Sequence, residues 1–295
     1  TYYAVHTLDI LTGDAKSAIT EKTLTPRHEV IPEGKYRVYM AHLKSSPLCE
    51  GSPEKMVDTV RSMRLDLVGA KTYDVDAARA YAEEKGYEVE ILANPENYPH
   101  SMKRLGGHPA HHLSNWLIPP DMTPEQRAVY EKCEEFGKQG LPWSEFKDKV
   151  FAPMLDMGTI VYPELDYSMM NAYMVYDDGL YGGNGFNAFM IGLGWPSWDW
   201  VRQTPYRERW VGKLPAVADG DSHEDLTKWM DRPEKQRILY IAEGYRLPQF
   251  LESLKNNRSV CVIRDDRVEG GVVYYGSQAA VDYVKKHRAE WQWWE

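Results

Sequence analysis

The sequence has little cysteine and no long apolar run. Its three cysteines, Cys49, Cys133 and Cys261, are too few and too widely spaced for a disulfide framework or a zinc ribbon. Such cysteine use favours the cytoplasm, whereas export after cleavage of a signal peptide stays open because residue 1 is Thr and not Met. No run of about 18 apolar residues is present, so we expect neither a membrane-spanning helix nor a membrane partner.

Basic residues are in the minority. The chain has 35 Lys and Arg residues against 44 Asp and Glu residues, which gives a formal net charge of -9. Nucleic-acid binding depends on a basic surface that neutralises phosphates, so we expect no nucleic-acid partner. The sequence also lacks a G-x-S-x-G elbow, a Walker loop and an H-E-x-x-H pair. What is present is 43% hydrophobic and 12% aromatic residues without a short repeat, which predicts a folded acidic protein.

Short β-type segments alternate with helical ones in the first third of the chain. Ser52-Pro53-Glu54 is typical of a helix start, with Ser as N-cap and Pro in the first turn. Gly86 is typical of the position that follows a helix. We expect strands over 35–42, 65–70 and 87–93, separated by helices over 52–64 and 76–85.

The same alternation continues to about residue 263. Thr123-Pro124-Glu125-Gln126 is a capping box, which predicts a helix that extends to about Phe136. Strand–helix–strand order is typical of an α/β fold with a parallel sheet. We expect this sheet to close into a barrel, because no Gly-rich nucleotide loop follows the first strand. The later helices are expected over 144–155 and 248–256, and the later strands over 158–162, 186–193, 214–218, 238–242 and 259–263.

Residues that bind metals or transfer protons follow several of these strands. His42 ends the first strand and Glu96 follows the third, where the loops of parallel α/β folds carry the active site. Asp221 and His223 lie two residues apart in an extended segment, so they can face one site and bind Zn or Mn. Alternatively, Asp221 caps a helix that begins near Glu224.

Three histidines, His108, His111 and His112, fall in one loop. Neutral imidazole is the commonest metal ligand, so this loop is a candidate source of one ligand. The alternative is a surface loop whose histidines are solvated. Pro109 disfavours a regular helix here, which removes the usual i, i+4 arrangement of two ligands.

Aromatic residues gather in the second half of the chain. Trp195 and Trp198 lie in one cluster, and Tyr181 ends a segment rich in Tyr and acidic residues. Flat aromatic faces stack on sugar rings and aryl groups. We therefore expect these three residues, with His108, to bind a small-molecule or carbohydrate substrate, with core filling as the alternative. The tryptophan-rich tail at 291–294 is expected either to fill the core or to join subunits of a homo-oligomer.

The order of these motifs resembles that of polymerase-and-histidinol-phosphatase (PHP) domains. There, an H-x-H strand precedes a helix that starts S-P-E or T-P-E and a strand that ends in T-D-H; the matching segments here are VYMAHLKSS, GSPEKMVDTV and LDLVGAKTYD. Glu96 matches the family's bridging glutamate, GGHPAHHLSN its G-H loop, GTIVYPELD its A-H-P strand and AVADGDSHEDL its G-S-D-S-H strand. The branch that the sequence resembles most is that of the carbaryl-hydrolase-like metallohydrolases.

The resemblance implies a fold and a domain organisation. The fold is a distorted (β/α)7-type barrel related to the TIM barrel, which forms a single domain over 1–295. The resemblance itself covers about 36–263, which would be the barrel core, with 1–35 and 264–295 as additions to it.

The resemblance also implies a metal site, which is reduced here. The first histidine of the family's H-x-H is replaced by Met40, whereas His42 matches the second. The histidines of T-D-H and A-H-P are replaced by Tyr73 and Tyr162 respectively. A full trinuclear centre is therefore not expected, and the site holds at most one divalent transition metal, Zn or Mn. The ligands that remain are His42, Glu96, His112, Asp221 and His223.

Two enzyme classes and one binding class fit this reduced site. A metal-dependent hydrolase would act on a phosphoester, an ester or a carbohydrate-type substrate, with Asp221 and His223 as acid/base groups and Tyr73 and Tyr162 protonating or orienting the leaving group. A metal-free glycosidase or lyase would use the same tyrosine, histidine and carboxylate groups directly. A sugar-binding relative without catalysis is the third class.

Overall fold

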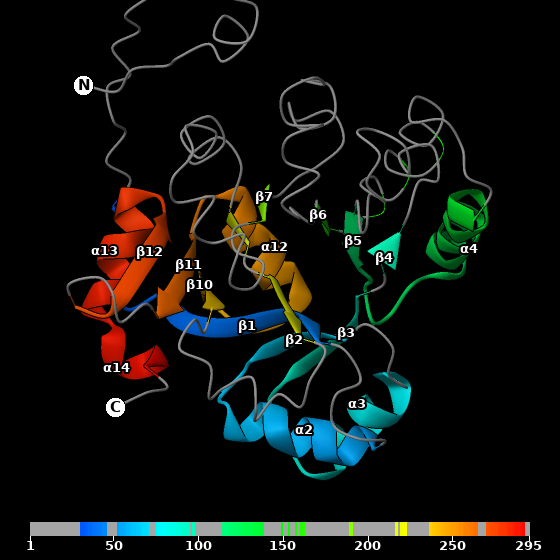
Figure 1. Ribbon diagram of the computed structural model, residues 1–295, viewed down its shortest axis with the longest axis horizontal. Coiled ribbons are helices and arrows are strands. Elements are labelled where there is room, and N and C mark those ends of the chain that lie inside the picture. The colour runs from blue at the N-terminus through cyan, green and yellow to red at the C-terminus, as the bar shows by residue number, and fades with distance from the viewer. Residues whose placement is uncertain are drawn as a thin grey trace, which may run out of the picture.

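In the residues that it describes, the computed structural model contains one main sheet and two smaller ones. In the main sheet seven strands are joined, in the order β12-β11-β10-β1-β2-β3, with β9 also paired to β1. Figure 1 shows these strands in the middle of the molecule, with α2 and α3 below them and α13 beside β12. The structure describes residues 30–45, 52–70, 75–94, 96–97, 114–138, 149, 153, 157, 160–162, 189–190, 216–217, 219–222, 236–264 and 270–292.

The bounds of the elements follow the chain. The main sheet consists of β1 (Arg37–Ser45), β2 (Leu67–Ala70), β3 (Glu90–Ala93), β9 (Asp219–Ser222), β10 (Gln236–Ala242), β11 (Ser259–Arg264) and β12 (Val272–Gly276). A second sheet has β4 (Glu96–Asn97), β5 (Ser114–Leu117) and β6 (Ile160–Tyr162), and a third has β7 (Phe189–Met190) and β8 (Ala216–Val217). The helices are α2 (Pro53–Ser62), α3 (Val75–Glu84), α4 (Pro124–Lys138), α12 (Leu247–Lys255), α13 (Gln278–Lys286) and α14 (Arg288–Trp291).

The helix starts form as their sequences predict. Ser52 is the N-cap of α2, and its hydroxyl accepts a hydrogen bond from the Lys55 N–H at 3.3 Å. Before α4, the Thr123 N–H donates to the Gln126 side chain at 2.9 Å and the Gln126 N–H donates to the Thr123 hydroxyl at 3.2 Å. This reciprocal pair is the predicted capping box. Gly86 follows α3 with φ of +64°, the left-handed conformation that glycine adopts at little cost.

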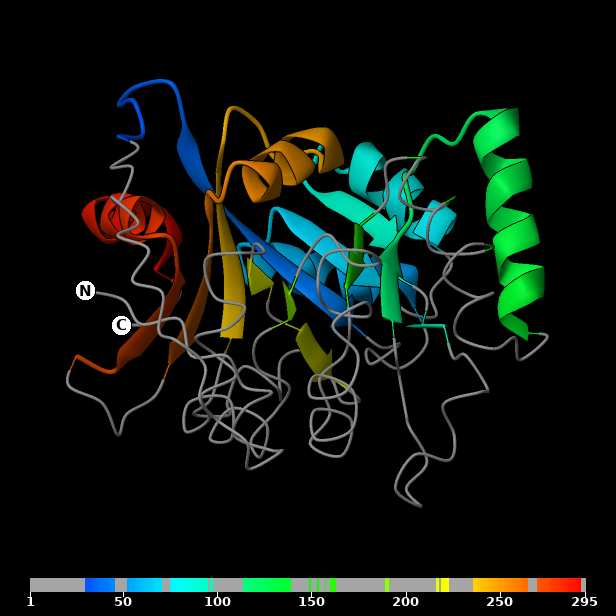
Figure 2. The same cartoon turned by 90° about the horizontal axis from the view of Figure 1, so that it is seen from above.

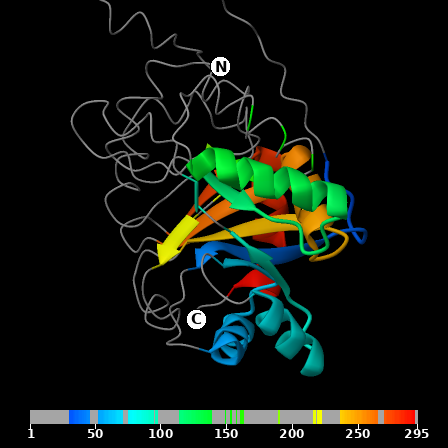
Figure 3. The same ribbon diagram turned by 90° about the vertical axis from the view of Figure 1, so that its right-hand side faces the viewer.

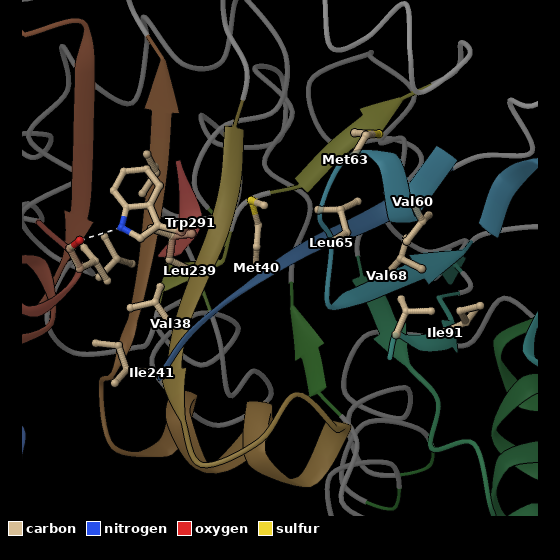
Figure 4. Close-up of a cluster of buried hydrophobic side chains, with 14 of the residues drawn as sticks. Val38, Met40, Val60, Met63, Leu65, Val68, Ile91, Leu239, Ile241 and Trp291 are labelled. Atoms are coloured by element: carbon tan, nitrogen blue, oxygen red, sulfur yellow. Dashed lines mark hydrogen bonds between the residues drawn. The ribbon is translucent and has the colours of Figure 1, made fainter. Parts of the chain in front are cut away.

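One face of the main sheet is covered by four helices. Alternate residues of β1 and β10, such as Val38, Met40 and Leu239, pack there against α2, α3, α13 and α14. Figure 4 shows this apolar cluster, with Trp291 beside the strands. Trp291 is 1% exposed, and its indole N–H donates to the Val284 carbonyl at 2.7 Å. This tryptophan of the tail therefore fills the core.

The opposite face carries the other set of alternating side chains. Tyr240 stacks on Tyr39 at 5.5 Å between ring centroids and meets Phe250 of α12 edge-on at 4.9 Å. Figure 3 shows α2 and α3 below the sheet and α12 on its other side. The main sheet is thus buried on both faces near β1 and β10, which explains why these strands are nearly continuous apolar runs.

The sheet differs from the predicted parallel barrel. β9, β1, β2 and β3 are parallel, but β10 is antiparallel to β1, and β11 and β12 continue antiparallel. Within the described residues the sheet is open, ending at β12 and β3, so the fold is α/β with a mixed sheet and a closed barrel is not shown. The segment 264–295 supplies the edge strand β12. No helix in the described part of the chain has both the length and the apolar character needed to cross a membrane.

Candidate functional site

Four parallel strands end in one row. Ser45 of β1 pairs with Ala70 of β2 and with Ser222 of β9, and Ala70 pairs with Ala93 of β3. We call this row the carboxyl edge. Because β10 is antiparallel to β1, its first residues also lie at this edge. The carboxyl edge is where the sequence predicts the functional residues, because loops at such ends carry the active sites of parallel α/β folds.

His42 lies on β1 just before this edge. Its side chain is buried, with 2% exposed, and strand alternation places it on the same face as Met40. Burial lowers the pKa of His42 well below 6.5, and the nearby charge of Arg237 lowers it further. The imidazole is therefore neutral near pH 7, which is the protonation state that metal binding requires.

Arg237, at the start of β10, is a residue that the sequence reasoning missed. Ala41 pairs with Ile238, so the next residues along the two strands are His42 and Arg237. The Arg237 side chain is fully buried, and this burial lowers its pKa to about 9. The sequence signal that points to it is a charged residue directly before the apolar part of β10, residues 238–242.

β9 brings Asp221 to the strand that carries His42. Leu43 of β1 pairs with Asp219, and Ser45 pairs with Ser222, so Asp221 lies on the strand directly beside the end of β1. The two strands are therefore neighbours, whereas the predicted convergence of their site residues stays a prediction. The side chain of Asp221 and the whole of His223 lie outside the described part of the structure.

Glu96 and Tyr162 share one row of the second sheet. Glu96 of β4 and Tyr162 of β6 both pair with Asn115 of β5, one from each side. Two strand spacings of about 4.8 Å place their backbones roughly 10 Å apart. A bridge between Ala93 and Ile118 joins this sheet to the end of β3, so the row adjoins the carboxyl edge. Their side chains are outside the described part of the structure.

Asn94 is a second residue that the sequence reasoning missed. It directly follows β3, is fully buried, and its N–H donates to the Ala70 carbonyl at 2.8 Å. Gly69 leaves room for it, because a Cβ at position 69 would lie 2.5 Å from Asn94 Oδ1. The carboxyl edge thus includes a buried amide at the end of a parallel strand, packed against a glycine whose lack of a side chain makes room for it. Its sequence signal is a polar residue directly after an apolar strand.

The remaining predicted site residues lie outside the described part of the chain, and their roles stay predictions. They are Tyr73, His108, His111, His112, Tyr181, Trp195, Trp198 and His223. The other tail tryptophans, Trp293 and Trp294, are also outside it, so the predicted homo-oligomer stays a prediction as well.

The fit of a metal to these residues is mixed. Within the described residues, no group of three or more His, Cys, Asp or Glu side chains is placed to hold a metal ion. His42 is neutral and therefore suitable as a donor, but the Arg237 guanidinium next to it repels a divalent cation. A metal at this edge would therefore depend on Glu96, Asp221, His223 and a loop histidine, which are carboxylate and imidazole donors suited to Zn or Mn.

Comparisons with known proteins give distant similarity to solved structures alone. No model of a known protein family matches the chain, and no curated protein matches it. Among solved structures it is similar to a two-domain protein from Bacteroides vulgatus that contains a predicted PHP-like metal-dependent phosphoesterase, with 12% sequence identity and a TM-score of 0.46. The similarity covers 79% of this chain and 67% of that one. Values this low do not establish a shared fold.

Proposed function

We propose that the chain is a hydrolase whose active site lies at the carboxyl edge. The observation that supports this most is the parallel pairing of β9 with the end of β1, which brings the strands of His42 and Asp221 side by side. The same edge has a buried arginine beneath it and a buried amide at the end of β3. Burial lowers the pKa of Arg237 to about 9, and ionisable groups with perturbed pKa values are enriched at functional sites.

The site would hold at most one divalent metal. We assign its ligands to Glu96, His112, Asp221 and His223, and we give His42 a positioning role because Arg237 opposes a dication at that imidazole. When bound, such a metal would polarise a phosphoryl or carbonyl oxygen and acidify a water molecule. The Arg237 charge favours an anionic group at this edge, which supports a phosphoester or a carboxylated substrate.

The experiment uses protein purified without added metal. Elemental analysis and hydrolysis of aryl phosphates, aryl esters and aryl glycosides are measured for the wild type, for Asp221→Asn and for Asp121→Asn. Asp121 is an exposed residue before α4 and serves as the matched control. We expect hydrolysis of one substrate class and at least about a hundredfold loss in Asp221→Asn only. Equal rates in the two variants would contradict the assignment.

A metal-free carbohydrate-active enzyme is the second candidate. It is favoured by the shared pairing of Glu96 and Tyr162 with Asn115, which brings a carboxylate residue and a phenol residue to one row beside the edge. These two groups would act as a general acid/base pair on a glycosidic bond or an acidic sugar. The test is activity on uronate polymers or aryl glycosides, measured with and without a chelator. Activity that resists the chelator and disappears in both Glu96→Gln and Tyr162→Phe would support this candidate over the metal-dependent one.

A further inference from the structure

A hollow lies at the end of β1 and β10 that is opposite to the carboxyl edge. It has a volume of about 390 Å³ and is lined by residues of α12, by the end of β10 and by the chain before β1. Figure 2 shows α12 beside the end of β10 and close to the start of β1. Arg37 pairs with Ala242, so this hollow is separated from the carboxyl edge by the length of the strands. It is therefore not part of the site described above.

Helix α12 presents unsatisfied polar atoms to this hollow. Gln249 and Ser253, one turn apart, both line it. Ser253 is 1% exposed. Within the described residues its hydroxyl has no hydrogen-bond partner, and neither has the buried Oε1 of Gln249. Buried polar atoms in native proteins are almost always paired, and a ligand in the hollow would supply partners for these two.

Some charged residues that line the hollow form an ion pair with each other, and others do not. Lys35 and Glu243 neutralise each other at 2.7 Å. Arg258 lies over the Tyr36 ring, 4.6 Å from its centroid, and has no carboxylate partner in the part of the chain that the structure describes.

Glu252 is the other uncompensated charge. It accepts a hydrogen bond from the Asn256 amide at 2.6 Å, and none of the described cations pairs with it. Apart from the Lys35–Glu243 pair, the hollow thus offers one cation, Arg258, and one anion, Glu252, together with a hydroxyl and an amide oxygen of α12.

We propose that this hollow binds a small zwitterion, a free α-amino acid. The ligand's carboxylate would bind the Arg258 guanidinium, and its ammonium group would bind Glu252 and the Gln249 oxygen, with Ser253 donating to or accepting from the ligand. A dianion such as phosphate is opposed by Glu252, and a simple amine is opposed by Arg258. The volume lies within the range of small-molecule sites, roughly 300–1,000 Å³.

Isothermal titration of the full-length chain with each standard L-amino acid tests this proposal. We expect saturable binding of at least one of them, and we expect its N-acetyl and its methyl-ester derivatives, which each lack one charge, to bind about tenfold more weakly or worse. The wild type alone provides this comparison, so the result does not depend on any variant folding. Failure of every amino acid to bind, or equal binding of a derivative, would overturn the proposal.

Variants then locate the site. Arg258→Gln and Glu252→Gln should each weaken binding about tenfold or more, and Ser253→Ala should weaken it by about threefold or more. Arg127→Gln, which changes an exposed arginine of α4, is the matched control and should bind like the wild type. Asp221→Asn at the carboxyl edge should also leave binding unchanged, which separates this site from the hydrolase proposal. Wild-type affinity in both Arg258→Gln and Glu252→Gln would contradict the placement.

Discussion

The two halves of strand β1 have different surroundings. The amino half pairs with β10 over Arg37–Ala41, and its inward residues are apolar. In the carboxyl half, β9 pairs with β1 instead, and His42 and Arg237 are buried together. The first half belongs to an apolar core, and burial of its side chains contributes to stability. The second half carries buried polar groups, whose burial is costly. This comparison agrees with our proposal that the carboxyl edge carries the function, whereas the amino half contributes to stability.

The largest effect on stability is expected for Trp291→Ala at the amino half. This change removes a fully packed indole, its hydrogen bond to Val284 and its edge-on contact with Tyr274. We expect a loss of about 3–5 kcal/mol in the free energy of unfolding, measured by urea denaturation. The catalytic rate of the remaining folded protein should be unchanged. A loss below about 1 kcal/mol would show that this tryptophan is not a core residue.

Asp66, which is hydrogen-bonded to the amino half of β1, predicts a dependence of stability on pH. Its carboxylate accepts the Met40 N–H at 2.7 Å, and burial raises its pKa from 3.8 to about 6. Because the folded-state pKa is raised, the unfolded chain releases this proton first. The contribution to stability is therefore full below pH 3.8 and is lost as the pH rises through about 6.

Asp66→Asn should remove this dependence, because an amide oxygen can accept the same hydrogen bond without ionising. At pH 8 we expect the variant to be more stable than the wild type by about 2–3 kcal/mol, an upper value because Asp66 is partly exposed. Urea denaturation of both proteins between pH 4 and pH 8 measures the difference. Parallel stability curves over this range would contradict the assignment. Asp58→Asn, on the exposed side of α2, is the control.

Gly69→Ala tests the packing of the carboxyl edge. The new methyl group would lie 2.5 Å from Asn94 Oδ1, so the amide must shift. We expect a destabilisation of about 1–3 kcal/mol together with a fall in the hydrolysis rate. The double variant Gly69→Ala with Asn94→Ala should recover part of the stability but none of the activity. Full activity in the single variant would indicate that Asn94 has a structural role only.

The smallest effect is expected for the cap of α2. Ser52→Ala removes the hydroxyl that accepts the Lys55 N–H, and it should cost about 1 kcal/mol without changing activity. Ser52→Asp should restore the stability, because a carboxylate also caps the helix and interacts favourably with its dipole. Thermal denaturation followed by circular dichroism is sufficient for this comparison. An Asp variant no more stable than the Ala variant would contradict the capping role.

Local elements could be predicted from the sequence where short-range chemistry determines them. Ser52, Gly86 and Thr123–Gln126 each specify a helix boundary through contacts within one turn. Strand direction depends on longer-range geometry. Helix α12 has nine residues and is about 13.5 Å long, whereas the seven residues of β10 span about 23 Å. The helix is therefore too short to carry the chain back to the start of β10. β11 therefore starts where β10 ends and runs antiparallel, which the strand–helix–strand pattern alone did not indicate.

The candidate site could be predicted only in part for a similar reason. His42 and Asp221 are polar residues at strand ends, so their types and positions indicated a shared edge, and the pairing of β9 with β1 brings their strands together. Arg237 has a sequence signal, a charge at the start of an apolar strand, but its place at the carboxyl edge follows only from the antiparallel direction of β10. Asn94 likewise depends on the close approach of Gly69, which is a property of two packed strands.

Arg237→Met tests the central claim most directly, through stability and hydrolysis measured on the same sample. Removing one buried charged side chain leaves the groups that interact with it without a partner, which costs stability. We therefore predict a lower free energy of unfolding together with at least about a tenfold loss of hydrolysis in the fraction that remains folded. Full hydrolysis in that folded fraction would contradict the account, because Arg237 would then support the fold and not the function.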